Sequence, residues 1–211
     1  MILLSDPRVA AVPSRDDGDP LVDVRDIPEL RLDGRAADAA GAYARLRSEV
    51  AVRLVDAQSK LPDGVRLLVV EGYRPYAAQQ AIFTRYQEEL RRLHPTWGEA
   101  RLRVEASKFV SPVEVAPHST GGAVDLTLCT PEGIELDMGT AVDATPVESD
   151  DACFTGARNI SAAAGENRRV LIDALTAVGL VNYPTEWWHW SYGDRYWALT
   201  TGVAHTRYGP L

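Results

Sequence analysis

Long apolar runs are missing from this sequence. No stretch approaches the ~18 apolar residues that a membrane-spanning helix needs. The first residues, Met1-Ile-Leu-Leu-Ser-Asp, form too short an apolar run for a secretory signal, and no basic segment precedes them. We therefore expect a cytoplasmic protein without a membrane partner.

Basic residues are fewer than acidic ones. The chain has 30 acidic and 22 basic residues, which gives a formal net charge of −8, and the basic residues form no local patch. A polyanion would be repelled, so nucleic acid is excluded as a partner. The length of 211 residues, with 45% hydrophobic and 25% charged residues, predicts one globular domain that spans residues 1–211.

Cysteine and histidine are scarce, so a metal site has few candidate ligands. The two cysteines, Cys129 and Cys153, could pair, but without an export signal free thiols are the expected state. Of the four histidines, His94 precedes Pro95 and His205 lies in the C-terminal tail. We assign both a structural role, which leaves His118 and His189 as candidate ligands.

Periodicity and turn residues predict an α+β fold. We expect a small, mostly antiparallel sheet that carries the site, with helices packed on one side. Residues 1–40 are rich in Asp, Pro and Arg and predict an irregular arm, and residues 129–165 lack periodicity and predict a long loop. Apolar spacing predicts helices over 41–61, 77–93 and 166–178, and strands over 21–25, 66–71, 123–128, 180–183 and 187–190.

His118 lies seven residues before Asp125, which the pattern places in a strand. Burying a bare carboxylate between Val124 and Leu126 is costly, and coordination to a cation removes that cost. The Gly121-Gly122 pair lets the backbone fold His118 back toward Asp125. Taken singly, the two side chains could equally be a loop histidine and a turn cap.

A second candidate pair, Glu186 and His189, lies among tryptophans. A catalytic zinc ion needs three protein ligands, an open position for water, and a carboxylate that takes the proton of that water. His118, Asp125 and His189 meet the first requirement, and Glu186 is free to act as the base. Residues three apart on an ideal strand face opposite sides, so a turn or bulge is required between Glu186 and His189.

Arg74 follows the predicted strand 66–71 in the sequence Glu71-Gly-Tyr-Arg-Pro75. Its guanidinium could contact a carboxylate or a developing oxyanion. An Arg-Pro pair at a strand end also commonly serves as a simple turn, so Arg74 alone does not define a function.

Together these segments resemble the VanX-type D-alanyl-D-alanine dipeptidases, which are zinc enzymes of the hedgehog-like metallopeptidase group. Their first zinc motif, S-x-H-x-x-G-x-A-x-D, is matched by His118, Gly121, Ala123 and Asp125. Their second motif, E-x-x-H followed by an aromatic residue, is matched by Glu186, His189 and Trp190. Their Y-R-P turn is matched by Tyr73-Arg74-Pro75, and 136–140 resembles a segment at the rim of their active site.

The resemblance runs from about residue 43 to the C-terminus and implies one Zn²⁺ per chain. It implies Glu186 as catalytic base, Arg74 as a catalytic and substrate-binding residue, and Tyr73 as a substrate contact. The implied substrate is D-Ala-D-Ala in a small closed pocket. The sequence departs from the pattern at Ala116, where the family has Ser, and at Val142, where an aromatic residue is expected.

These departures affect substrate recognition more than metal binding. A zinc D,D-carboxypeptidase and a dipeptidase of other specificity therefore stay open as alternatives, as does a non-hydrolytic zinc-bearing binding module. The sequence does not indicate an oligomeric state.

Overall fold

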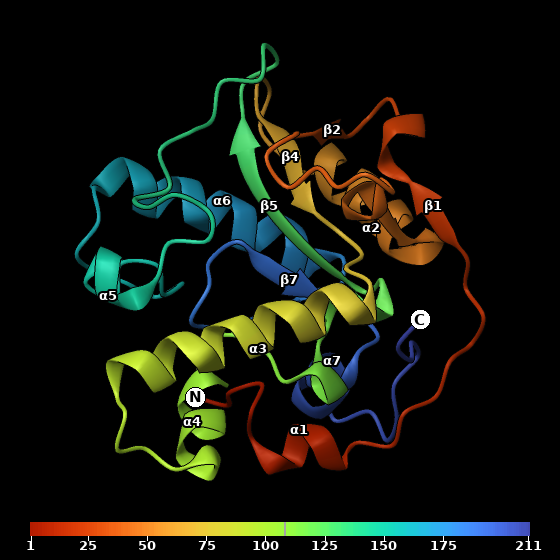
Figure 1. The fold of residues 1–211 in the computed structure, drawn as a ribbon. Helices are drawn as coiled ribbons and strands as arrows, with labels where there is room; N and C mark the ends of the chain where they lie inside the picture. Colours follow the sequence, from red (N-terminus) through yellow and green to blue (C-terminus); the bar gives the residue numbers. More distant parts are fainter. Residues whose placement is uncertain (108) are drawn as a thin grey trace.

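The computed structural model describes residues 1–107 and 109–211, and its centre is a five-stranded sheet (Figure 1). The strand order is β2-β4-β5-β7-β6. Among the described strands of this sheet, β2 and β4 are parallel and the other neighbours are antiparallel. The predicted α+β class is therefore confirmed. The strands are Arg31–Leu32 (β2), Arg66–Glu71 (β4), Ala123–Cys129 (β5), Val181–Asn182 (β6) and His189–Ser191 (β7).

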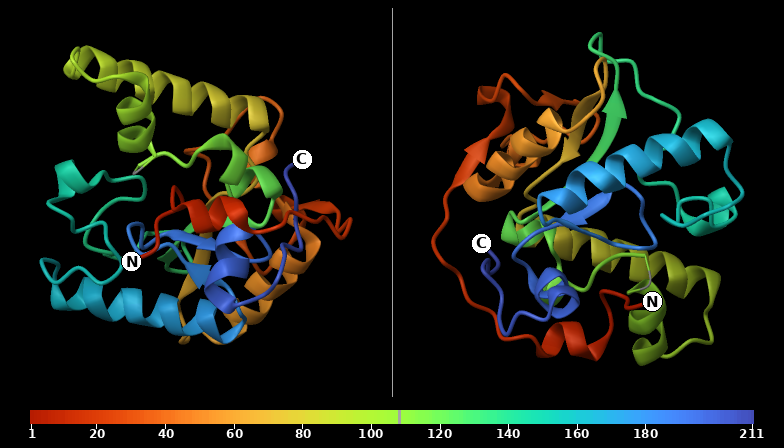
Figure 2. Two further views of the ribbon diagram at one scale, coloured as in Figure 1. Left: turned by 90° about the horizontal axis from the view of Figure 1, so that it is seen from below. Right: turned by 180° about the vertical axis from the view of Figure 1, so that it is seen from behind.

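Two helices, α2 (Ser48–Ser59) and α6 (Ala162–Ala177), cover one face of the sheet (Figure 2). Their buried side chains, such as Leu54 and Leu171, join the main core with apolar residues of β4 and β5. Helix α6 begins four residues before the predicted start, because Ser161 caps it by accepting a hydrogen bond from the amide of Ala164.

Helix α3 (Tyr76–Leu93) matches the predicted helix and lies on the other side of the sheet (Figure 2). It packs against α4 (Glu99–Ala106) through a separate apolar cluster that contains Phe83 and Ala106. Because α3 makes its own small core, it does not close down on the sheet. A cavity remains between α3 and the strands.

The predicted helix over 41–61 is wrong in its first third. Residues Ala42–Ala44 form a 3-10 turn (η2), and Arg45–Arg47 form strand β3, which pairs with β1 (Leu21–Asp23) in a separate two-stranded sheet. Pairing with β1 overrides the helical spacing of these residues.

The remaining elements are short. The predicted long loop over 129–165 is irregular except for α5, and a C-terminal helix, α7, was not predicted. The bounds are Pro7–Ala11 (α1), Val24–Asp26 (η1), Val113–Val115 (η3), His118–Thr120 (η4), Pro146–Ser149 (α5) and Arg195–Thr201 (α7). No described helix is long and apolar enough to cross a bilayer, and Cys129 and Cys153 are buried free thiols.

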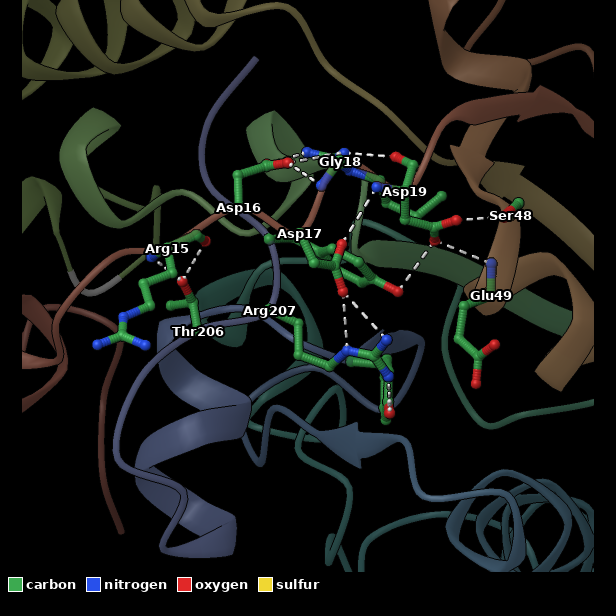
Figure 3. A network of polar contacts seen from close by, with 12 residues as sticks. Arg15, Asp16, Asp17, Gly18, Asp19, Ser48, Glu49, Thr206 and Arg207 are labelled. Atoms are coloured by element: carbon green, nitrogen blue, oxygen red, sulfur yellow. Dashed lines mark hydrogen bonds and ion pairs between the residues drawn. The ribbon is translucent and has the colours of Figure 1, made fainter.

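Polar contacts attach residues 15–19 to both the C-terminal tail and α2 (Figure 3). The amide of Arg15 donates to the hydroxyl of Thr206 over 2.7 Å, and Asp17 forms an ion pair with Arg207 at 3.0 Å. Residues 15–17 are thereby attached to Thr206 and Arg207 near the C-terminus.

Asp19 caps α2 from a distant part of the chain. Its carboxylate accepts hydrogen bonds from the hydroxyl of Ser48 and the amide of Glu49 (Figure 3). It also accepts one from the hydroxyl of Tyr208. Helix α2 has no side-chain cap of its own, so Asp19 supplies the missing acceptor. Burial alone would raise the pKa of Asp19, but these hydrogen bonds lower it.

We predict that Asp19→Ala lowers the free energy of unfolding by about 1–2 kcal/mol, because the first amides of α2 lose their acceptor. Urea denaturation near neutral pH measures the loss. The control is Asp17→Ala, which removes a half-exposed ion pair with Arg207 and an exposed hydrogen bond from the amide of Asp19, and it should cost less than about 1 kcal/mol. Since the pKa of Asp19 is lowered in the fold, its contribution should be lost as pH falls below the usual range of a carboxyl group. Equal losses in the two variants would contradict the capping role.

Candidate metal centre

Strand pairing brings Glu71, Asp125 and His189 side by side on three neighbouring strands. Asp125 of β5 pairs with His189 of β7 and with Glu71 of β4. The register of β4 shifts between Val69 and Glu71, and this bulge moves Glu71 opposite Asp125 instead of Val124. Cross-strand partners point to the same face of a sheet, so these three polar side chains share one face.

His118 reaches the same point from the short helix η4, which directly precedes β5. The helix ends at Gly121, whose φ of 72° is left-handed, and a Cβ on Gly122 would lie 2.5 Å from the carbonyl oxygen of Tyr192. The Gly-Gly pair is therefore required by both backbone conformation and space. The buried Arg47 holds this turn by donating from its Nε to the carbonyl of Thr120 over 2.7 Å.

The three predicted ligands meet in one buried cluster. His118 Nε2 lies 3.3 Å from Asp125 Oδ2, and His189 Nδ1 lies 2.9 Å from Asp125 Oδ1. The two imidazole nitrogens, His118 Nε2 and His189 Nδ1, are 3.1 Å apart. Each of the three residues is at most 5% exposed, and no other group of three described His, Cys, Asp or Glu residues could hold a metal ion.

Hydrogen bonding prepares His118 to act as a ligand. Its Nδ1 lies 2.7 Å from the carbonyl oxygen of Gly72, and this contact requires the proton to be on Nδ1. In the neutral imidazole, which is the form that binds a metal, the lone pair is then on Nε2, which faces Asp125. Burial alone would raise the pKa of Asp125, but the two imidazoles lower it below the usual range, so the centre carries a carboxylate.

The spacing of these atoms fits a tetrahedral cation. Atoms that bind zinc at about 2.0–2.1 Å lie about 3.3–3.4 Å from one another. The observed separations of 2.9 Å, 3.1 Å and 3.3 Å are shorter by up to about half an ångström, so the side chains would move slightly apart around a bound ion. Two imidazoles and one carboxylate can therefore hold a divalent metal and leave one position open.

Glu186 lies beside this cluster without belonging to it. The amide of His189 donates to the carbonyl of Glu186 over 3.2 Å, which closes a turn through Trp187 and Trp188. This is the turn that the sequence requires, and the predicted strand 187–190 accordingly begins only at His189. A carboxylate oxygen of Glu186 is 3.9 Å from His189 Nδ1, and burial raises the pKa of Glu186 to about 7.

Arg74 faces the same cavity and is held by two partners. It forms a two-pronged ion pair with Glu71 and donates to the side-chain oxygen of Gln79 over 2.8 Å. Gln79 is itself buried and donates to the carbonyl of Ser111. The sequence analysis did not identify Glu71 and Gln79 as partners of Arg74. No residue pattern in β4 predicts the bulge that positions Glu71.

Tyr73 is not brought to the cavity. Its hydroxyl donates to the carbonyl of Leu211 over 3.2 Å, and it is not among the described residues that line the cavity. Ala116 and Val142, where the sequence departs from the resembled motifs, are buried outside the lining as well.

The cavity has a volume of about 690 Å³, so it is not the small closed pocket that the sequence led us to expect. It contains His118, Asp125, Glu186, His189 and Arg74. It also contains Asp143, a residue that the sequence analysis missed.

Asp143 comes from the loop after β5 and has a left-handed φ of 65°. Burial, together with the nearby carboxylates of Asp125 and Glu71, raises its pKa to about 6. An acidic side chain in this environment is best neutralised by a cationic group of a ligand. The sequence could have pointed to Asp143 because this residue lies three positions after the rim segment 136–140.

Arg168 of α6 holds the loop that carries Asp143. It is 2% exposed, and its guanidinium donates to the carbonyls of Met138, Ala152 and Phe154, each over 2.7 Å. It also lies over the ring of Trp187, 5.5 Å from the ring centroid. Burial lowers the pKa of Arg168 to about 10. One buried cation therefore fixes both ends of the loop and the turn after Glu186.

We predict that Arg168→Gln lowers the free energy of unfolding by about 3 kcal/mol, because buried carbonyls lose their donors. It should also raise the KM for peptide more than it lowers kcat, since the displaced loop carries Asp143. Urea unfolding and steady-state kinetics measure the two effects. The control is Arg169→Gln, because the exposed side chain of Arg169 pairs with Glu166. This variant should change the free energy of unfolding by no more than about 0.5 kcal/mol. Indistinguishable variants would refute the role of Arg168.

Comparison with known proteins agrees with this geometry. A D-alanyl-D-alanine dipeptidase of Synechocystis sp. is 28% identical over 223 residues, covering 92% of this chain and 90% of that protein. A D-alanyl-D-alanine dipeptidase of Streptomyces coelicolor is 33% identical over 145 residues, covering 64% and 66%. The solved LdcB LD-carboxypeptidase shares the fold with a TM-score of 0.50 at 19% identity, covering 92% of this chain and 77% of that one.

The fold and the buried His-Asp-His cluster define a metallopeptidase. The model of the peptidase M15 family, described as D-ala-D-ala dipeptidase, matches residues 33–206. The chain belongs to this family, and the resemblance inferred from the sequence is confirmed.

Proposed function

We propose that the protein hydrolyses a short peptide with one zinc ion per chain, held by His118, Asp125 and His189. The observation that carries this proposal is the buried cluster of two imidazoles and one carboxylate beside a free glutamate. Nitrogen and carboxylate donors in this number are typical of catalytic zinc sites. Bound zinc would lower the pKa of a coordinated water and polarise the scissile carbonyl.

The protein's own residues carry the remaining steps. Glu186 takes the proton of the attacking water and passes it to the nitrogen of the leaving amine as the amide bond breaks. Its carboxylate lies close to the centre, 3.9 Å from His189 Nδ1, and faces the same cavity. Arg74, held by Glu71 and Gln79, directs its free N–H groups at the oxyanion that forms on the attacked carbonyl.

The leading substrate is the dipeptide D-Ala-D-Ala. Support comes from the family and from two of the charged groups that line the cavity, Asp143 and Arg74. Asp143 would accept the substrate's ammonium group. Tyr73 stays a predicted substrate contact, and it would have to release Leu211 to reach the cavity.

A peptide assay tests this proposal against its alternatives. The zinc-loaded protein is incubated with D-Ala-D-Ala, with L-Ala-L-Ala and with a pentapeptide that ends in D-Ala-D-Ala, and released amino acid is measured. Preferred cleavage of D-Ala-D-Ala is the expected result. Preferred cleavage of the pentapeptide would assign a D,D-carboxypeptidase, and preferred cleavage of L-Ala-L-Ala another dipeptidase. Inertness toward all three, with zinc confirmed, would favour a binding module.

A further inference from the structure

Part of the cavity lining is apolar and consists of residues that supply no candidate metal ligand. We call Leu3, Leu4, Ile82, Phe109 and Val110 the apolar annex; all five line the same cavity as the metal ligands. Phe109 is 37% exposed, and Ile82 and Val110 are half-buried. These side chains present apolar surface to the cavity, and burying it against a ligand is favourable.

The annex is built from packed elements. Phe109 meets the ring of Tyr86 edge-on, with ring centroids 6.2 Å apart, and Tyr86 is one helical turn from Ile82 on α3. The amide of Leu4 donates to the hydroxyl of Tyr183, itself a cavity residue. The two sides of the annex are therefore attached to α3 and to the segment that precedes Glu186.

The cavity is larger than a pocket that would fit D-Ala-D-Ala closely. At about 690 Å³ the cavity lies in the middle of the range that encloses drug-sized ligands. The two methyl side chains of D-Ala-D-Ala would not fill the annex, which would then hold water. An additional apolar group on the substrate would fill it and gain the burial energy.

Charged side chains that line the cavity can orient a dipeptide by pairing with its two charged ends. Arg85 lies three residues after Ile82 on α3 and lines the cavity, and it forms no hydrogen bond or ion pair with the described residues. Asp143, on the loop after β5, is the acidic counterpart on another wall. A dipeptide bound with its ammonium at Asp143 and its carboxylate at Arg85 would place the side chain of its last residue beside Ile82, which lies three residues from Arg85 on α3.

We propose that the preferred substrates are dipeptides whose carboxyl-terminal residue has a bulky apolar side chain, which binds in the apolar annex while the terminal carboxylate pairs with Arg85. This proposal rests on the proposed peptidase function and changes its preferred substrate: D-Ala-D-Ala is cleaved, but less efficiently than a dipeptide whose last residue is bulky and apolar. The amide bond that breaks is the one that joins the two residues, and water supplies the new carboxylate and amine.

The test compares D-Ala-D-Phe with D-Ala-D-Ala on the zinc-loaded full chain. We expect kcat/KM to be at least about tenfold higher for D-Ala-D-Phe. Ile82→Trp should remove most of this preference by filling the annex, whereas the matched control Ala81→Trp, on the exposed neighbouring position of α3, should keep it. A preference for D-Ala-D-Ala in the unaltered chain, or one for D-Ala-D-Phe that Ile82→Trp leaves intact, would overturn the proposal.

Binding provides a readout that does not depend on turnover or on the folding of the Ile82 variant. Isothermal titration of zinc-loaded Glu186→Gln should give a Kd for D-Ala-D-Phe at least about tenfold below that for D-Ala-D-Ala. Arg85→Gln in that background should weaken binding of both dipeptides, while Arg92→Gln on the same helix should not. Hydrolysis of D-Ala-D-Ala without any gain for D-Ala-D-Phe would refute the annex alone. Hydrolysis of neither, with zinc bound, would refute the proposed function as well.

Discussion

Replacing Glu186 by Ala should reduce peptide turnover by about two to four orders of magnitude, which is what a general base contributes, and leave the metal in place. Glu186 lies 3.9 Å from His189 Nδ1 but outside the cluster of ligand atoms. Its loss therefore removes the proton acceptor and not a ligand. Single-turnover kinetics and metal analysis of the same sample measure the two effects.

The conservative variant Glu186→Gln sharpens this test. Glutamine keeps the size of the side chain and cannot accept the proton, so it should be as inactive as alanine. If Glu186→Gln retained near-normal hydrolysis, Glu186 would not be the base.

Replacing His189 by Ala should remove metal and activity together. His189 supplies one of the three buried ligand groups, and its Nδ1 is 2.9 Å from Asp125. With two protein ligands left, zinc affinity should fall by at least about a hundredfold, a loss beyond the 10–100-fold typical of outer-shell changes. Competition with a chromophoric chelator measures the affinity.

His205→Ala is the matched control for this prediction. His205 lies in the C-terminal tail, where its Nδ1 contacts the carbonyl of Thr206. That variant should bind zinc as the unaltered protein does. A His189→Ala protein that keeps full metal content would show that His189 is not a ligand.

The parts of the fold that the sequence predicted are those with strong local signals. The apolar stripe of α3 and the β-branched run of β4 each point to one structure, and both were found. The candidate ligands His118, Asp125 and His189 were identifiable because they are few, fall in ordered motifs, and two of them stand among apolar neighbours where a bare polar group is costly.

The features that were missed depend on contacts between distant parts of the chain. Strand β3 forms because residues 45–47 pair with β1, and nothing within those residues predicts that partner. The bulge that sets Glu71 opposite Asp125 is a property of the β4–β5 pairing. Arg168 looks like any basic residue of a helix until the loop carbonyls around it are known.

The size and lining of the cavity could not be predicted from the sequence either. Its walls combine the first residues of the chain with α3 and the loop that carries Asp143. Periodicity locates the elements but does not give the distance between α3 and the sheet, so it could not predict a volume.

Anomalous diffraction at the zinc edge from crystals of the zinc-loaded protein tests the central claim most directly. We predict one strong peak per chain, within bonding distance of His118 Nε2, the Asp125 carboxylate and His189 Nδ1. A zinc ion found elsewhere, or those three side chains too far apart to bind one ion, would contradict it.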